Sequence, residues 1–154
     1  METIRLIRGK KGSKRHLLVD EHGVPLSLIV TGANRHDVRG LEVVLDARII
    51  PAEPDEEIRP NLCADAGYTG EPAEEIIRAH GYIPHVRSCG EEKSGKAHNP
   101  QYRAKRWVVE VCHSWFNQFR KLIVRYEKSL ASFLALHQLA AAIIAIRKAI
   151  PIYG

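Results

Sequence analysis

The sequence predicts a soluble α/β domain with a mixed sheet, and three features of the chain lead to this prediction. Two short apolar runs flank a glycine-bearing turn, a strand–helix–strand unit follows, and the last third of the chain has helical periodicity. The 154 residues are enough for one domain with a buried core and too few for two large ones. Apolar residues make up 45% and charged residues 27%, which is typical of globular proteins. We expect a single domain over residues 1–154.

A β-hairpin is predicted over residues 16–31. The runs at 16–20 and 25–30 are rich in branched apolar side chains, and Gly23 lies in the turn between them. From Val38 to Ile50 the apolar residues recur at helical spacing, which predicts an amphipathic helix. An acidic segment with prolines follows at 51–57 and ends this helix.

The middle of the chain, residues 61–87, predicts a strand–helix–strand unit. The apolar stretch at 61–64 ends at Asp65, and Pro72 stands in the first turn of the helix that follows. Gly81 marks the end of that helix, before a second strand. Two strands joined by a helix are expected to be parallel, and functional groups gather at the carboxyl ends of parallel strands. Asp65 is therefore a candidate functional residue.

Two helices are predicted in the last third, at 102–122 and 131–150. The first has an apolar face that includes both tryptophans, Trp107 and Trp115, and an opposite face that is polar. The second is apolar nearly all round, so we expect it to pack centrally in the protein rather than to span a membrane. This order of elements suits a ribonuclease-H-like mixed sheet flanked by helices, although other α/β folds share it.

Charge is unevenly distributed along the chain, whose net charge is +5. Residues 1–16 hold six basic and one acidic residue, a local charge of +5. Residues 42–75 hold ten acidic and two basic residues, a local charge of −8, and residues 87–128 hold ten basic and four acidic residues, a local charge of +6. Basic surfaces attract polyanions, so nucleic acid is a candidate partner, and a solubilising surface is the alternative.

Three cysteines without a C-x-x-C spacing argue against a disulfide framework and a zinc ribbon. They fit a reducing compartment, which favours a cytoplasmic location.

Two acids are candidates for metal chemistry. Asp65 follows a buried strand, and Glu110 stands in the predicted helix among Arg106, His113 and Asn117. Carboxylates brought together from separate elements can hold Mg²⁺, which prefers oxygen ligands. The alternatives are structural, because Asp65 could cap the following helix and Glu110 could pair with Arg106 at i−4. Trp107 and Trp115 could stack on a base, but we expect them to pack in the core.

Four blocks of sequence carry a family resemblance. They are KKGSKRHLLVD at 10–20, TGANRHD at 31–37, CADAGY at 63–68 and RWVVE at 106–110, the last followed by WFN, FRKL and RYE between 115 and 127. In this order the blocks resemble the DDE transposases of bacterial insertion sequences, in the insertion-sequence four/five superfamily.

The resemblance implies a function and a set of site residues. It implies DNA cleavage and strand transfer at insertion-sequence ends, with Mg²⁺ (or Mn²⁺) as cofactor. Asp65 resembles the second acid of the triad and Glu110 the third, both as metal ligands, and Arg106 resembles the family's helix arginine that orients the site or contacts phosphate. A basic rim would contact the DNA backbone: Lys10, Lys11, Lys14, Arg15, Arg120, Lys121 and Arg125.

The resemblance also implies partners and a location. The partners would be DNA, both transposon ends and target, with the chain acting as a homodimer or in an assembly with full-length transposase. No membrane is expected, and the location would be cytoplasmic and nucleoid-associated in bacteria.

The chain departs from the family pattern at the first triad acid. That acid normally lies on the first strand of the sheet, upstream of the hairpin, where this sequence has only residues 1–8, so we expect the sheet to lack its first strand. Glu2 is too close to the basic block, and Asp20 stands at the hairpin turn. The chain thus resembles the C-terminal part of a transposase catalytic domain, as a truncated or frameshift-split copy that is inactive alone. The alternative is a non-catalytic fragment that binds DNA or transposase and dampens transposition.

Overall fold

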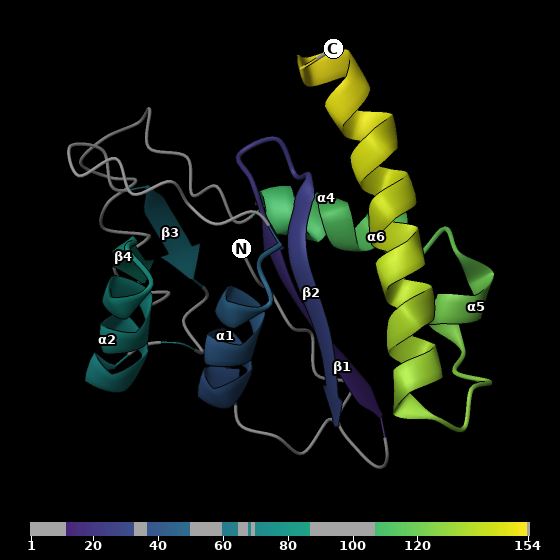
Figure 1. The fold of residues 1–154 in the computed structure, drawn as a ribbon, viewed down its shortest axis with the longest axis horizontal. Coiled ribbons are helices and arrows are strands. Elements are labelled where there is room, and N and C mark those ends of the chain that lie inside the picture. Colours follow the sequence, from purple (N-terminus) through teal and green to yellow (C-terminus); the bar gives the residue numbers. More distant parts are fainter. Residues whose placement is uncertain are drawn as a thin grey trace.

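The computed structural model describes residues 12–32, 37–49, 60–64, 68, 70–86 and 107–153, and Figure 1 shows their arrangement. Two strands come first, a helix and a strand–helix–strand unit follow, and the described elements after β4 are all helices. The elements in chain order are β1 (Ser13–Val19), β2 (Pro25–Gly32), α1 (Asp37–Asp46), β3 (Asn61–Ala64), α2 (Glu71–Ala79), β4 (Ile83–Val86), α4 (Trp107–Phe116), α5 (Arg120–Ile123) and α6 (Leu130–Tyr153).

β1 and β2 form an antiparallel hairpin in the predicted region, with Leu17 opposite Leu28. Gly23 has a φ of 85°, a left-handed conformation that glycine adopts without steric cost. The carboxylate of Asp20 accepts hydrogen bonds from the backbone amides of His22 (2.9 Å) and Val24 (2.8 Å). Asp20 therefore stabilises the hairpin turn.

β3 and β4 are parallel, with Asn61 opposite Ile83, and α2 connects them. Pro72 stands in the first turn of α2, where backbone N–H groups have no partner within the helix, so the missing N–H of proline costs no hydrogen bond. The arrangement of strands differs from the expected single mixed sheet. Among the described residues, β1 with β2 and β3 with β4 make two separate two-stranded sheets.

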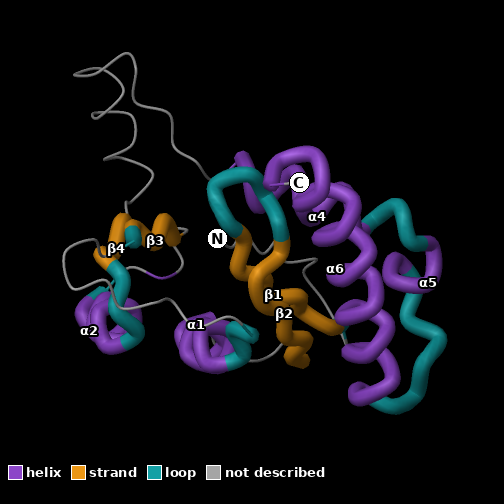
Figure 2. Tube along the Cα trace, turned by 45° about the horizontal axis from the view of Figure 1, so that its top comes forward, coloured by secondary structure: helices purple, strands orange, loops and turns teal. Residues whose placement is uncertain are grey.

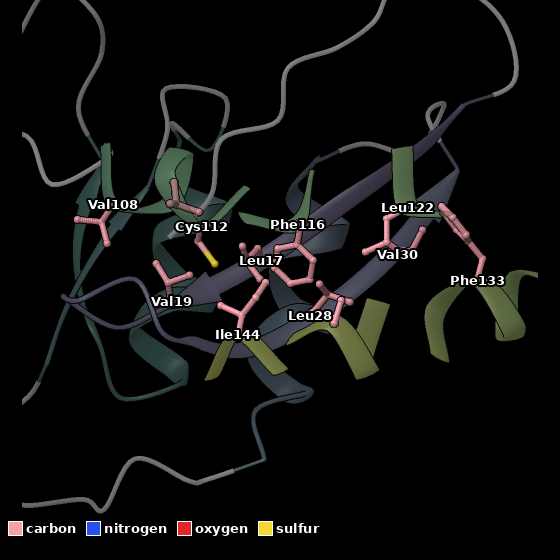
Figure 3. Packing of buried hydrophobic residues seen from close by; sticks show 12 residues of the cluster. Leu17, Val19, Leu28, Val30, Val108, Cys112, Phe116, Leu122, Phe133 and Ile144 are labelled. Carbon is pink, nitrogen blue, oxygen red and sulfur yellow. The ribbon is translucent and has the colours of Figure 1, made fainter. Parts of the chain in front are cut away.

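Two hydrophobic cores lie on opposite faces of the β1–β2 hairpin. Because successive side chains of a strand alternate between faces, Leu17 and Val19 enter one core and Leu18 enters the other. The first core joins the hairpin to α4 and α6, and Figure 3 shows its side chains around Phe116. The second joins the hairpin to α1, α2 and β3. Figure 2 shows α1 and α2 on one side of the hairpin and α4 and α6 on the other.

The helix expected over 102–122 is interrupted in the structure. α4 ends at Phe116, and α5 begins at Arg120. Residues six apart on one continuous helix would point about 120° apart, since each residue turns the helix by about 100°. The break lets Phe116 (0% exposed) and Leu122 (6% exposed) enter the same core.

α6 is less buried than predicted. Phe133, Ala140 and Ile144 pack into the first core, but Leu139 and Ile146 are each 60% exposed. The helix is long and apolar enough to cross a membrane by length and composition alone, a test that core helices of soluble proteins also pass. Only 22% of its most apolar stretch is buried. The expectation that α6 packs centrally is wrong. One side of the helix packs against one face of the hairpin, and its other side is exposed.

Candidate metal and DNA site

Glu110 lies in the first turn of α4 and is exposed. Val108, Val109, Cys112 and Phe116 are the buried residues of this helix. With 3.6 residues per turn, these positions share one side of the helix, and Glu110 faces away from them. The helix is thus fixed by its apolar side, and its acid is free to meet a ligand from solvent.

Asp65 comes directly after the last residue of β3 and lies outside the described residues, as do 66 and 67. The strand that leads to it is described. Leu62 and Ala64 are buried in the second core, and Cys63, on the opposite face of the strand, is half-buried. The buried side chains of β3 therefore hold Ala64, the residue directly before Asp65, in a defined position.

One cavity joins the two acid-bearing segments. It has a volume of about 550 Å³, and its lining includes Cys63 of β3 and Val108 of α4. Each of these residues stands two positions before a predicted metal ligand, Asp65 or Glu110. The carboxyl end of β3 and the first turn of α4 therefore border the same space.

The cavity also has polar walls. Asp20 and Glu21 line it from the hairpin turn, and Arg48 and His85 line it from the α1–β4 side. Arg48 donates a hydrogen bond to the hydroxyl of Tyr82, another lining residue. Within the described ranges, no three His, Cys, Asp or Glu side chains gather closely enough to hold a metal ion.

These elements and motifs agree with what the comparisons with known proteins found. The Transposase DDE domain family matches residues 7–145. The chain belongs to this family. It is 36% identical over 126 residues to a Burkholderia cepacia protein named as transposase for insertion sequence element IS402. The match covers 79% of this chain and 56% of that relative, so the chain spans about half the length of the curated relative. No solved structure matches the chain.

Family membership confirms the resemblance that the four motif blocks carry, and the chain is a DDE-type insertion-sequence transposase sequence. DNA binding and use of a divalent metal ion are expected for this family.

The structure separates the predicted basic rim of this DDE domain into four groups. Lys10 and Lys11 lie outside the described residues, as does Arg106, the predicted site arginine. Arg120 and Lys121 are exposed on α5. Lys14 and Arg15 differ from the expectation, because Lys14 is only 8% exposed and Arg15 is largely buried.

Arg125 is exposed, but its guanidinium already has several protein partners. It donates hydrogen bonds to the hydroxyl of Ser13 (3.0 Å) and to the carbonyls of Glu127 (2.9 Å) and Lys128 (3.3 Å). It also lies over the ring of Phe133, 5.2 Å from its centroid. Arg125 therefore holds the loop between α5 and α6 against β1.

Arg15 makes a buried cluster with α4 that the sequence analysis missed. Its guanidinium lies 4.7 Å from the centroid of the Phe116 ring and donates a hydrogen bond to Nδ1 of His113 (3.4 Å). Burial lowers the pKa of Arg15 to about 10, and burial together with the charge of Arg15 lowers the pKa of His113 to about 4. The alternation of β1 is the signal that could have predicted this, because it places Arg15 on the same face as Leu17 and Val19.

The remaining candidates on α4 are not equivalent. Trp115 packs against the first core, with the ammonium of Lys148 4.1 Å from its ring centroid. Trp107 is 55% exposed, so the expectation of core packing is wrong for this residue. Burial raises the pKa of the Cys112 thiol to about 12, so Cys112 stays protonated and unreactive at neutral pH.

Proposed function

We propose that this chain is the C-terminal part of a DDE transposase catalytic domain with a ribonuclease-H-like fold. In the complete enzyme this domain would cleave DNA at the ends of an insertion sequence and transfer the strand to target DNA. Asp65 and Glu110 would hold Mg²⁺ or Mn²⁺, and the bound ion would activate the attacking oxygen and stabilise the leaving oxygen. The observation that carries the proposal is the match of the Transposase DDE domain family to residues 7–145, which include both acids. The elements that lead to the two acids also border one cavity, which Cys63 and Val108 line, although the side chain of Glu110 lies on the other side of α4 from Val108.

Besides the two acids, basic residues would orient the metal site or contact the DNA backbone. Arg106 precedes Glu110 by four residues, about one helical turn, which would let it orient the carboxylate or contact a phosphate. The exposed Arg120 and Lys121 are the best described candidates for backbone contacts, with Lys10 and Lys11 as further candidates. Lys14, Arg15 and Arg125 would act in DNA binding only by positioning the surface, because the first two are largely buried and the third is engaged.

We propose that the chain alone does not cleave DNA, because two carboxylates lack the third acid of the family's triad. It would act in the bacterial cytoplasm at the nucleoid, on transposon ends and target DNA, as a homodimer or in an assembly with full-length transposase. The exposed Arg120 and Lys121 would serve a second candidate equally well, a non-catalytic fragment that binds DNA or transposase and dampens transposition, because binding alone needs no metal.

Metal binding tests the proposed acids. Mn²⁺ bound by the purified chain would be measured from the loss of the free-ion electron paramagnetic resonance signal. We expect Asp65→Asn and Glu110→Gln each to weaken binding by about tenfold or more, as removal of a carboxylate ligand does. Glu75→Gln, an exposed acid on α2, is the matched control and should bind as the wild type does. Unchanged binding in both ligand variants would overturn the metal site.

DNA cleavage tests the inactivity of the chain alone. The chain would be incubated with Mg²⁺ and supercoiled DNA that carries the element's ends, and nicked product would be measured. We expect none. Nicking that disappears in Asp65→Asn would show that the chain is a complete enzyme and would refute the proposed dependence on a further acid.

A further inference from the structure

Three apolar side chains are exposed together where α5 ends and the loop to α6 begins. Ile123 is 61% exposed, Val124 52% and Tyr126 76%. Single exposed apolar residues are common on soluble proteins, whereas several that stand together mark a surface that binds a partner. We call these three residues the α5 patch.

The backbone of the α5 patch is anchored to the rest of the protein. Leu122, the residue directly before the patch, is buried in the first core. Arg125, between Val124 and Tyr126, donates a hydrogen bond to the hydroxyl of Ser13 on β1 (3.0 Å). Because this backbone is already ordered, the exposed side chains can meet a partner without a further cost for ordering the loop.

The charge around the α5 patch is positive. Residues 120–130 hold four basic residues and one acidic residue, a local charge of +3. Arg120 and Lys121 are exposed and stand directly before Leu122, whereas the acidic residue, Glu127, is half-buried. Exposed cations favour a polyanion as the partner, and DNA binding is expected for the transposase family of this chain.

The position of α5 suits a partner that also reaches the proposed metal site. Figures 1 and 2 both show α5 at an edge of the described structure, on the other side of α6 from α1. α4, which carries Glu110, ends at Phe116, and α5 begins at Arg120. The Cα atoms of Glu110 and Arg120 are therefore at most about 25 Å apart, less than one turn of a DNA duplex, which is about 34 Å.

We propose that the α5 patch is a wedge that enters the minor groove of bound DNA and separates two neighbouring base pairs. The inference rests on the proposed function, because the same DNA is bound. Phosphate contacts alone would leave the apolar side chains in water, whereas separated base pairs offer apolar faces that cover Ile123 and Val124. Arg120 and Lys121 contact the phosphates beside the kink, and the ring of Tyr126 stacks on an exposed base.

Binding to a distorted duplex tests the wedge. The full chain would be titrated into a fluorescein-labelled duplex of about 25 base pairs and into the same duplex with one central mismatch. Fluorescence anisotropy at one salt concentration measures both affinities. Bases at a mismatch are already poorly stacked, so a wedge enters there at a lower cost. We expect the mismatched duplex to bind at least tenfold more tightly than the paired one.

Matched pairs of substitutions distinguish the wedge from exposed apolar surface in general. Ile123→Ser with Val124→Ser should remove the preference for the mismatched duplex. The control, Leu139→Ser with Ile146→Ser, changes two residues of α6 that are each 60% exposed, and it should retain the full preference. The same preference in both variants would overturn the wedge.

The basic residues beside the patch have a separate signature. Arg120→Gln with Lys121→Gln should weaken binding to both duplexes by the same factor and leave the preference for the mismatch intact. It should also reduce the slope of log affinity against log salt by about 2, because about one counterion is released per phosphate contact. Loss of the preference in this variant would contradict its assignment to the apolar side chains.

Two further outcomes would contradict the inference. If the wild type binds both duplexes equally, or binds neither, the α5 patch does not separate base pairs. If Ile123→Ser with Val124→Ser lowers the mass of the protein in solution, measured by static light scattering, the patch is instead a contact between copies of the chain. Neither outcome touches the dependence of Mn²⁺ binding on Asp65 and Glu110, so the proposed metal site stands or falls separately.

Discussion

At the scale of single residues, close packing between α1 and β1 depends on the absence of a side chain at Gly40. A Cβ at this position would overlap the imidazole of His16, lying 2.5 Å from its Nδ1. His16 is fully buried, and its Nε2 is 2.9 Å from the hydroxyl of Thr31, so the ring cannot move away without losing a partly buried hydrogen bond. The glycine is therefore a packing requirement in a helix that would otherwise favour alanine.

Gly40→Ala is expected to destabilise the protein despite the higher helix propensity of alanine. Overpacking of a core costs about 1–3 kcal/mol, which exceeds the gain of about 1 kcal/mol from replacing a helical glycine. Urea denaturation followed by circular dichroism measures the difference in unfolding free energy. A double-mutant cycle with His16→Ala is the control, because the two changes together should cost less than their sum. A midpoint at or above that of the wild type would contradict the overlap.

At the scale of elements, α6 presents its two sides to different surroundings. Ile144 is 5% exposed in the first core, whereas Ile146, two residues later, is 60% exposed. Ile144→Ala is expected to cost about 2–5 kcal/mol of unfolding free energy, and Ile146→Ala is expected to stay within about 0.5 kcal/mol. Urea denaturation of the two variants measures this contrast. Equal losses would mean that a contact in solution covers the outer side of α6.

At the scale of the whole molecule, the sequence predicts local elements better than their assembly. The hairpin and the β3–α2–β4 unit follow from alternation and from Gly23, Pro72 and Gly81, which act over a few residues. The break before α5 and the exposed side of α6 depend on which surfaces meet, and apolar periodicity does not encode that choice. The candidate site shows the same contrast between local and distant signals. Glu110 could be selected from a local motif, whereas the burial of Arg15 depends on contacts with Phe116 and His113, which are about 100 residues away in the sequence.

Two histidines beside the first core, the half-buried His113 and the buried His137, are held in their neutral form, and this couples the stability of the whole molecule to pH. Burial, and then the charge of Arg15, lowers the pKa of His113 to about 4, and burial lowers that of His137, whose Nδ1 donates to the carbonyl of Phe133 (2.8 Å). In the unfolded chain both histidines would have a pKa of about 6.5. Between about pH 6.5 and 4 the unfolded state therefore binds more protons, and stability falls as the pH falls.

We expect the melting temperature to be nearly constant above about pH 7 and to decrease below about pH 6.5. Each histidine contributes a slope of up to about 1.4 kcal/mol per pH unit. In His113→Gln, whose amide oxygen can still accept from Arg15, the decrease should be shallower. The control His85→Gln changes an exposed imidazole on β4 and should retain the wild-type slope. Thermal denaturation of the three proteins from pH 8 to 4 tests this prediction. Parallel curves for all of them would contradict it, because they would mean that His113 gains its proton over the same pH range in the folded protein as in the unfolded chain.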